Sequence, residues 1–284
     1  MPQHTIGLLH PGEMGSAVGS AAKGASIRVI WASEDRSAAT RERAARSGLE
    51  DVVTLDRLVA ESDFILSICP PDAAGKVAHA VAARGFAGIY VDANAISPAT
   101  SRGIASEMEG AGARFVDAGI IGPPPVKPGT TRLYLSGDGA ADIAKLFADT
   151  PLEPVAMAAT IGAASALKMA YAAWTKGSAA LLIAVRALAV AEGVEEDLIE
   201  EWRKSIPELP SLSERAVANN ARKAWRFVGE MEEIAATLRD AGLPDGFPLA
   251  SEDVYRMLAG YKDAPAAPSI AEVASVLRNA ADPK

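Results

Sequence analysis

Short apolar runs alternate with helix-like segments over the first half of the chain. Runs enriched in Val, Ile, Leu and Phe predict strands at Thr5–Leu9, Ile27–Trp31, Asp51–Val53, Phe64–Ile68, Gly88–Val91, Arg114–Val116, Arg132–Leu135 and Pro154–Met157. The segments between them predict helices at Gly15–Lys23, Ser37–Arg46, Thr54–Glu61, Asp72–Ala83, Thr100–Ala111 and Asp142–Phe147. Strands that alternate with helices indicate an α/β fold whose mostly parallel sheet is covered on both faces.

The pattern changes after Thr160, where strand signals stop. A long, alanine-rich apolar helix is predicted from Ile161 to about Ala191. Further helices are predicted at Glu195–Lys204, Leu212–Asn220, Ala221–Ala241, Ser251–Leu258 and Ile270–Ala280. We therefore expect an α/β domain over residues 1–160, followed by an all-α domain over residues 161–284.

A glycine-rich turn follows the first predicted strand. Strand, glycine turn, helix and second strand all lie within about thirty residues, which is typical of a dinucleotide-binding Rossmann unit. Gly12 would let the backbone approach a pyrophosphate, and Gly15 would let the helix pack closely on the strand. The usual first glycine of this turn is His10 here. The residues of the turn expected to border the nucleotide are His10, Pro11, Gly12, Glu13 and Met14.

The turn after the second strand bears on the choice of cofactor. Arg36, with the hydroxyls of Ser33 and Ser37, suits the 2′-phosphate of NADP. An acidic residue near this point would instead bind the ribose hydroxyls of NAD, which therefore remains possible. In a purely structural alternative, Ser37 or Asp35 caps the next helix and Arg36 is solvated.

The ends of two later strands are also expected to lie at the ligand edge of the sheet. Cys69 and Pro70 end one of them, and Asn94 follows the next. Ligands of open α/β sheets bind outside the carboxyl ends of the strands, so we expect all three residues to contact the cofactor. Asn94 could also meet the substrate, or it could simply form an Asx-turn before the next helix.

Lys168 is the candidate for acid–base chemistry because it lies on an otherwise apolar helix. Tyr171 and Thr175 follow at i+3 and i+7, on the same helical face, which suits a wet cleft. A desolvated lysine can act as general acid or base. A lysine whose head reaches solvent from an apolar stem would look the same in sequence.

Composition excludes several classes of function. The chain has 284 residues, of which 49% are hydrophobic, and a formal net charge of −8, so nucleic acid is not an expected partner. One cysteine and three histidines allow neither a disulfide framework nor a zinc-binding spacing, and no metal is expected. No secretory signal pattern opens the chain, and Lys168, Lys176 and Arg186 interrupt the most apolar segment. We therefore expect a cytoplasmic protein with no membrane partner.

These motifs together resemble those of the β-hydroxyacid dehydrogenase superfamily, which includes 6-phosphogluconate and 3-hydroxyisobutyrate dehydrogenases and has imine reductases as relatives. The resemblance rests on the segments Gly7–Gly15, Asp92–Asn94 and Val116–Gly119, and on Gly162 with Lys168. Residues 224–231 resemble the branch with a phosphogluconate-dehydrogenase-like C-terminal domain. The resemblance implies a homodimer whose cleft is completed across subunits, and a lysine, here Lys168, that shuttles the proton of the substrate hydroxyl.

Three departures from the family bear on the substrate. Where the family has Ser-Gly-Gly in its substrate loop, this chain has Ile121-Gly122-Pro123. Where the family has an asparagine four residues after the lysine, this chain has Ala172. The later Lys-Asp pair of the family is replaced by Glu230-Met231. If Glu230 faced the cleft it would repel an anionic substrate, whereas on an exposed helix face it would be solvated.

The resulting hypothesis is an NADP-preferring oxidoreductase for a small polar alcohol or 3-hydroxyacid, with Lys168 and Tyr171 as its catalytic residues. The residues expected to line the substrate pocket are Asn94, Gly119, Gly122, Thr175 and Glu230. An imine reductase or reductive aminase is one alternative, and a non-catalytic nucleotide-binding dimer is another. The apolar character of residues 161–191 favours a homodimer in each case.

Overall fold

The computed structural model describes residues 4–23 and 27–280, so the outermost ends of the two expected domains lie outside it. The chain forms two compact units, Met1–Met169 and Ala170–Lys284, which divide a few residues beyond the expected boundary after Thr160. The first residues of the long helix therefore belong to the same unit as the sheet.

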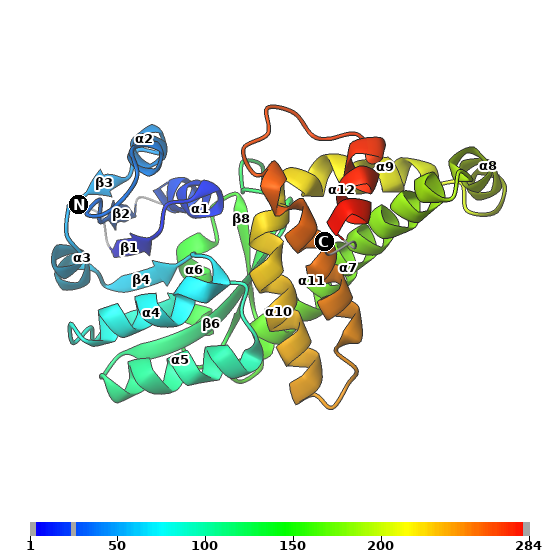
Figure 1. Cartoon of the computed structure of the whole chain (residues 1–284). Coiled ribbons are helices and arrows are strands. Elements are labelled where there is room, and N and C mark those ends of the chain that lie inside the picture. The colour runs from blue at the N-terminus through cyan, green and yellow to red at the C-terminus, as the bar shows by residue number, and fades with distance from the viewer. Residues whose placement is uncertain (1–3, 24–26, 281–284) are drawn as a thin grey trace. The chain divides into compact units, whose positions relative to one another are not determined.

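The first unit is built on an eight-stranded sheet in the order β3-β2-β1-β4-β5-β6-β7-β8 (Figure 1). Its strands are β1 (Thr5–Leu9), β2 (Arg28–Trp31), β3 (Glu50–Asp51), β4 (Phe64–Ser67), β5 (Ile89–Asp92), β6 (Arg114–Ile121), β7 (Thr131–Ser136) and β8 (Leu152–Ala156). All neighbouring strands are parallel except β6 and β7. The mostly parallel α/β sheet expected from the sequence is confirmed.

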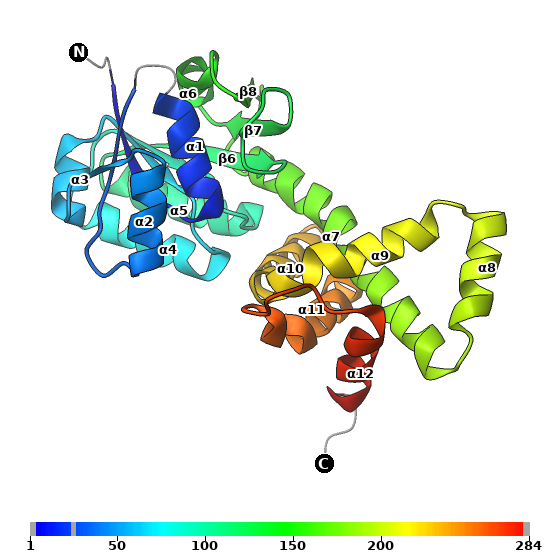
Figure 2. The same ribbon diagram turned by 90° about the horizontal axis from the view of Figure 1, so that it is seen from above.

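Alternating side chains along the strands form two hydrophobic clusters, one on each face of the sheet. Leu8 and Val29 belong to one cluster, whereas Leu9 and Ile30 belong to the other, as the two-residue period of a strand requires. The first cluster includes residues of α1 (Glu13–Lys23), α2 (Ala38–Arg46) and α6 (Ala140–Phe147). The second includes residues of α3 (Leu55–Glu61), α4 (Pro71–Ala82) and α5 (Pro98–Gly110), so helices cover both faces (Figures 1 and 2).

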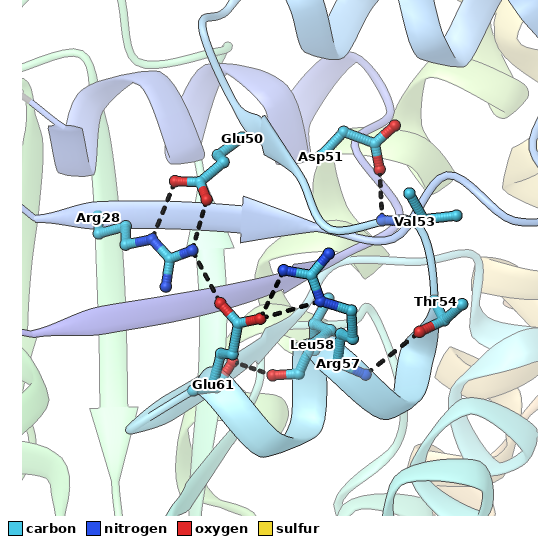
Figure 3. Close-up of polar contacts among 9 residues, drawn as sticks. Arg28, Glu50, Asp51, Val53, Thr54, Arg57, Leu58 and Glu61 are labelled. Carbon is cyan, nitrogen blue, oxygen red and sulfur yellow. Dashed lines mark hydrogen bonds and ion pairs between the residues drawn. The ribbon is translucent and has the colours of Figure 1, made fainter.

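An ion-pair network holds the short edge strand β3 against its neighbours (Figure 3). The Arg28 guanidinium donates from Nε to Glu50 Oε2 at 2.9 Å and from Nη2 to Glu61 Oε2 at 2.8 Å. Arg57 donates to the other oxygen of Glu61 at 2.9 Å. Hydrogen bonds from Arg28 lower the pKa of both carboxyls and are the largest cause in each case. The expected strand at Asp51–Val53 ends sooner, because Val53 turns to φ +69° with its N–H bonded to Asp51.

The second unit is helical. Its helices are α7 (Ala163–Ala191, which starts in the first unit), α8 (Glu195–Ser205), α9 (Leu209–Asn220), α10 (Ala224–Asp240), α11 (Gly246–Leu258) and α12 (Ile270–Ala280), with short 3₁₀ turns η1 (Ala221–Lys223) and η2 (Ala259–Tyr261). Helices α10 and α11 lie side by side in both views (Figures 1 and 2). Among the described residues, α7 is the one helix whose length and apolar composition would allow it to cross a membrane, and core helices pass the same test.

Two helices begin earlier than the sequence pattern predicted. Helix α9 starts at Leu209 rather than Leu212, and α11 starts at Gly246 rather than Ser251. Pro210 and Pro248 each lie in the first turn of their helix. A proline is tolerated there because the N–H that it lacks has no intrahelical acceptor.

Candidate functional site

The glycine turn between β1 and α1 combines one tightly packed glycine with one open glycine. A Cβ atom at Gly15 would lie 2.6 Å from the carbonyl oxygen of His10, so this position admits only glycine without rearrangement. A Cβ atom at Gly12 would meet nothing closer than that same oxygen, at 4.0 Å. The turn is closed by the Gly12 N–H donating to the His10 carbonyl at 2.7 Å and by the Ser16 hydroxyl donating to the Gly12 carbonyl at 2.7 Å. Gly12 thus presents an open backbone face beside the start of α1.

His10 occupies the place of the first glycine and adopts a glycine-like backbone, with φ +62°. Burial, with a smaller contribution from the positive charge of Arg36, lowers the pKa of His10 to about 4, so the ring is neutral at pH 7. Its Nδ1 is buried and has no hydrogen-bond partner among the described residues. A buried unpartnered nitrogen beside an open glycine backbone is compatible with a bound nucleotide, which would supply the missing polar group.

The turn after β2 and helix α2 place Arg36 and Arg43 near the glycine turn. The Ser33 carbonyl accepts hydrogen bonds from the Arg36 N–H at 3.1 Å and from Arg41 Nη2 at 3.2 Å. Arg43 Nη1 donates to the Pro11 carbonyl at 3.4 Å. Glu34 and Asp35 are exposed. Ser37 takes the capping role that the sequence left open, because its hydroxyl accepts the Thr40 N–H at the start of α2.

Asn94 links the ends of β4 and β5 instead of facing an open pocket. Only 2% of its surface is exposed, its Oδ1 accepts the Cys69 N–H at 2.6 Å, and its Nδ2 donates to Ser67 Oγ at 3.1 Å. In this structure Asn94 orders the loop that carries Cys69, and its contact with a cofactor or substrate stays a prediction. Burial raises the pKa of the Cys69 thiol to about 12, so the thiol stays neutral. Pro70 precedes α4 and is exposed.

A buried carboxyl lies beneath this loop. Asp92 accepts the Asn94 N–H on Oδ1 at 3.0 Å, whereas its Oδ2 has no partner among the described residues. Burial raises the pKa of Asp92 to about 7, and the hydrogen bond from the Asn94 N–H is the largest opposing effect. The carboxyl is therefore partly protonated at neutral pH.

The structure places Lys168 against the carboxyl-terminal end of β6. Its Nζ donates to the Ile120 carbonyl at 2.9 Å. Close approach of α7 depends on Gly119, where a Cβ atom would lie 2.8 Å from the Ala164 carbonyl oxygen and 3.1 Å from Lys168 Cβ. Gly122 has φ +130°, and a Cβ there would lie 2.4 Å from the Thr130 carbonyl oxygen. Both glycines thus shape the backbone around Lys168, and neither has a side chain to offer a substrate.

The sequence pattern missed the role of Asp117, the most heavily bonded carboxylate of this unit. It is fully buried on β6 and accepts five hydrogen bonds, at 2.5–3.1 Å, from three serines and two backbone N–H groups. The donors are the hydroxyls of Ser101, Ser136 and Ser165 and the N–H groups of Gly162 and Ser165. The sequence signals were an aspartate within a mostly apolar strand and its place in the Val116–Gly119 segment of the family resemblance.

The remaining predicted residues belong to the helical unit. Tyr171 is 46% exposed, and the Thr175 hydroxyl donates to the Tyr171 carbonyl at 3.1 Å, a local contact within α7. Glu230 forms an ion pair with Lys176, and each side chain is 13% exposed. Lys176 also lies over the Phe227 ring, 4.8 Å from its centroid. Glu230 is therefore mostly buried and paired, so the alternative of a solvated helix face is wrong, whereas its contact with a substrate stays a prediction.

Comparisons with known proteins identify relatives of both parts of the chain. Residues 5–145 match the model of the NAD binding domain of 6-phosphogluconate dehydrogenase, and residues 189–258 match a domain of unknown function, DUF1932. The chain is 31% identical over 196 residues to a 28.5 kDa protein from Methanothermus fervidus, covering 69% of this chain and 74% of that protein.

Two solved structures are similar over nearly the whole chain. One is a conserved protein described as structurally similar to 3-hydroxyacid dehydrogenases, with 28% identity, a TM-score of 0.67 and coverage of 91% of this chain and 98% of the other. The second is Mycobacterium tuberculosis 3-hydroxyisobutyrate dehydrogenase with L-serine, with 17% identity, a TM-score of 0.68 and coverage of 97% of this chain and 99% of the other. At this identity the comparison shows a likeness of fold alone. The chain therefore belongs to the β-hydroxyacid dehydrogenase superfamily, as a 3-hydroxyacid dehydrogenase-like oxidoreductase with an NAD(P)-binding domain.

Proposed function

We propose that this protein oxidises a small polar alcohol or 3-hydroxyacid, or reduces the corresponding carbonyl, and that Lys168 carries the hydroxyl proton. The observation that carries the proposal is the ammonium of Lys168 at the Ile120 carbonyl. Asp92 and Asp117 are paired in the parallel register of β5 and β6, so Ile120 lies beyond the carboxyl end of β5. This is the edge at which ligands of open α/β sheets bind, and the edge at which the glycine turn follows β1.

The residues of the chain have separable roles in this reaction. A bound nicotinamide dinucleotide supplies the two-electron acceptor or donor. The open Gly12 backbone and the start of α1 would hold its diphosphate. Lys168, as an amine, takes the hydroxyl proton in the oxidative direction and, as an ammonium, returns it to the carbonyl oxygen in the reductive direction.

A substrate panel assayed by cofactor absorbance tests the proposal. With NADP⁺ we expect turnover of short 3-hydroxyacids or polar alcohols, and with NADPH we expect reduction of their carbonyl counterparts. Turnover of imines alone would identify an imine reductase instead. Cofactor binding without turnover of any class would support a non-catalytic nucleotide-binding dimer and contradict the proposed function.

The NADP preference is proposed from the arginines around the turn after β2. Arg36 is close enough to His10 to lower the pKa of that ring, and Arg41 is bonded to Ser33 in the same turn. We expect Arg36→Ala to weaken NADPH binding about 10- to 150-fold and NADH binding less than twofold, because a charge-assisted hydrogen bond contributes about 1.5–3 kcal/mol. Fluorescence titration measures both affinities.

Arg46→Ala is the matched control for Arg36→Ala. Its side chain lies at the end of α2, is largely exposed and is 3.9 Å from Glu42. Its loss should leave both affinities unchanged. Equal losses of NADPH and NADH binding in the Arg36 variant would contradict a 2′-phosphate contact.

A homodimer is proposed from the exposed stripe of α7. Trp174, Leu181 and Leu188 recur at seven-residue spacing, hence on one face, and are 74%, 64% and 60% exposed. Large exposed apolar patches usually mark interaction surfaces. We expect a dimer mass by light scattering at micromolar concentration and a monomer mass for Leu181→Glu. Leu243→Glu, at an exposed leucine that follows α10, should remain dimeric. A monomeric wild-type protein would overturn this proposal.

A further inference from the structure

Asp117 joins the sheet to the first turn of α7. Its Oδ2 accepts the N–H groups of Gly162 at 2.9 Å and Ser165 at 3.1 Å, and its Oδ1 accepts the Ser165 hydroxyl at 2.5 Å. The first N–H groups of a helix have no intrahelical acceptor. The carboxylate on β6 therefore serves as a cap for α7 from a strand that lies 45–48 residues earlier in the chain.

The chemistry of this contact requires a charged oxygen pair. Asp117, Ser136 and Ser165 are each at most 1% exposed, and among the described residues no cation forms an ion pair with Asp117. Burying a carboxylate without a cation is costly unless its oxygens accept hydrogen bonds. The positive end of a long helix adds to the five donors and stabilises the same charge. Removing the negative charge of Asp117 therefore weakens its hydrogen bonds to the N–H groups at the start of α7 and its attraction to the positive end of that helix.

The contact between Asp117 and Ser165 lies about one helical turn from Lys168. Ser165 and Lys168 are separated by three positions on α7, and Asp117 and Ile120 by three positions on β6. The helix start thus meets the strand at two points, the Ser165–Asp117 contact and the Lys168–Ile120 contact. Gly119 lies between them on β6 and admits the helix backbone.

We propose that Asp117 is the positioning residue of the reaction: by capping α7 it sets where the Lys168 ammonium lies at the end of β6. This inference rests on the proposed role of Lys168. Asp117 is sealed from solvent, so it acts on the substrate only through the helix that it holds. A misplacement of a reacting group by about 1 Å can lower a rate up to about a hundredfold.

A double-mutant cycle tests whether Asp117 acts through Lys168. Asp117→Asn keeps the size of the side chain but replaces one acceptor oxygen with an N–H₂ donor, so either the two backbone N–H groups at Oδ2 or the two hydroxyls at Oδ1 lose their acceptor. We expect its kcat to fall about tenfold, with a change of less than twofold in NADPH affinity. In the Lys168→Met background the same substitution should have no further effect on kcat, because the group that it positions is gone.

A matched control separates positioning from stability. The Ser101 hydroxyl also donates to Asp117, at 2.9 Å, but it comes from α5, so Ser101→Ala removes a donor while leaving the α7 contacts in place. It should lower the melting temperature with kcat within twofold of wild type. If Asp117→Asn does not fold, Ser165→Ala is the second variant, because it removes only the hydroxyl that donates to Asp117 Oδ1. It should lower kcat when Lys168 is present and have no further effect in the Lys168→Met background.

The outcomes distinguish this inference from the proposed function. A full tenfold loss that persists in the Lys168→Met background would overturn the positioning role. A wild-type rate for Lys168→Met would instead overturn the proposed function, whatever Asp117→Asn does.

Discussion

Replacing Lys168 with methionine is expected to lower turnover by about two to four orders of magnitude, the span of general acid–base catalysis by a positioned side chain. Methionine keeps an unbranched, flexible stem of similar length and removes the ammonium that donates to the Ile120 carbonyl. Because the glycine turn and the arginines around it are unchanged, the affinity for NADPH should stay within twofold. Steady-state kinetics and a fluorescence titration on the same preparation measure both quantities.

Lys145→Met is the matched control for this prediction. Lys145 lies on α6 of the same unit and is exposed. Its Nζ forms an ion pair with Asp142 Oδ1 of the same helix, at 3.1 Å. Its loss should leave turnover and affinity unchanged. A turnover of Lys168→Met within threefold of wild type would remove the lysine from the mechanism. A parallel loss of NADPH affinity would mean that the lysine binds the cofactor rather than the reacting hydroxyl.

Strand β6 illustrates what the sequence could and could not predict. Its first residues were recognised as a strand, but the strand continues to Ile121 because it pairs on both sides, parallel with β5 and antiparallel with β7. The predicted end at Val116 is five residues short. A local pattern shows that a run is apolar, whereas the partner that keeps it extended becomes adjacent only in the folded sheet.

The residues of the candidate site differ in the same way, because some carry a local sequence signal and others depend on partners that are distant in the chain. Lys168 and the glycine turn could be selected as candidates from the sequence, because an amine on an apolar helix and a glycine after a buried strand are local signals. The role of Asp117 was not, because its partners Ser101, Ser136 and Ser165 are 16–48 residues away in the chain. Asn94 was assigned to ligand contact from its position at a strand end. In the structure its amide forms hydrogen bonds with Cys69 and Ser67, 25 and 27 residues earlier in the chain, which the sequence did not indicate.

Gly12→Val is the second substitution with a large expected effect, and it separates cofactor binding from folding. The position has an ordinary backbone, and a Cβ there meets only the His10 carbonyl oxygen, at 4.0 Å. Valine therefore fits the unliganded turn, and we expect a melting temperature within about 2 °C of wild type, since surface substitutions usually change stability by less than about 0.5 kcal/mol. The added methyl groups occupy the open backbone face where the diphosphate would lie. Steric overlap of this kind costs about 1–3 kcal/mol or more, so NADPH affinity should fall by about a hundredfold.

Two further glycine variants define what this result would mean. Gly103→Val, on the exposed face of α5 with nothing within 4 Å of its Cβ, should leave affinity unchanged and controls for a glycine-to-valine change. Gly15→Ala should lower the melting temperature, because its Cβ would lie 2.6 Å from a backbone oxygen that cannot move independently of the turn. If Gly12→Val bound NADPH as tightly as wild type, the diphosphate could not lie on the Gly12 backbone. The contrast between an open and a packed glycine three residues apart is therefore the most direct measure of where this chain holds its cofactor.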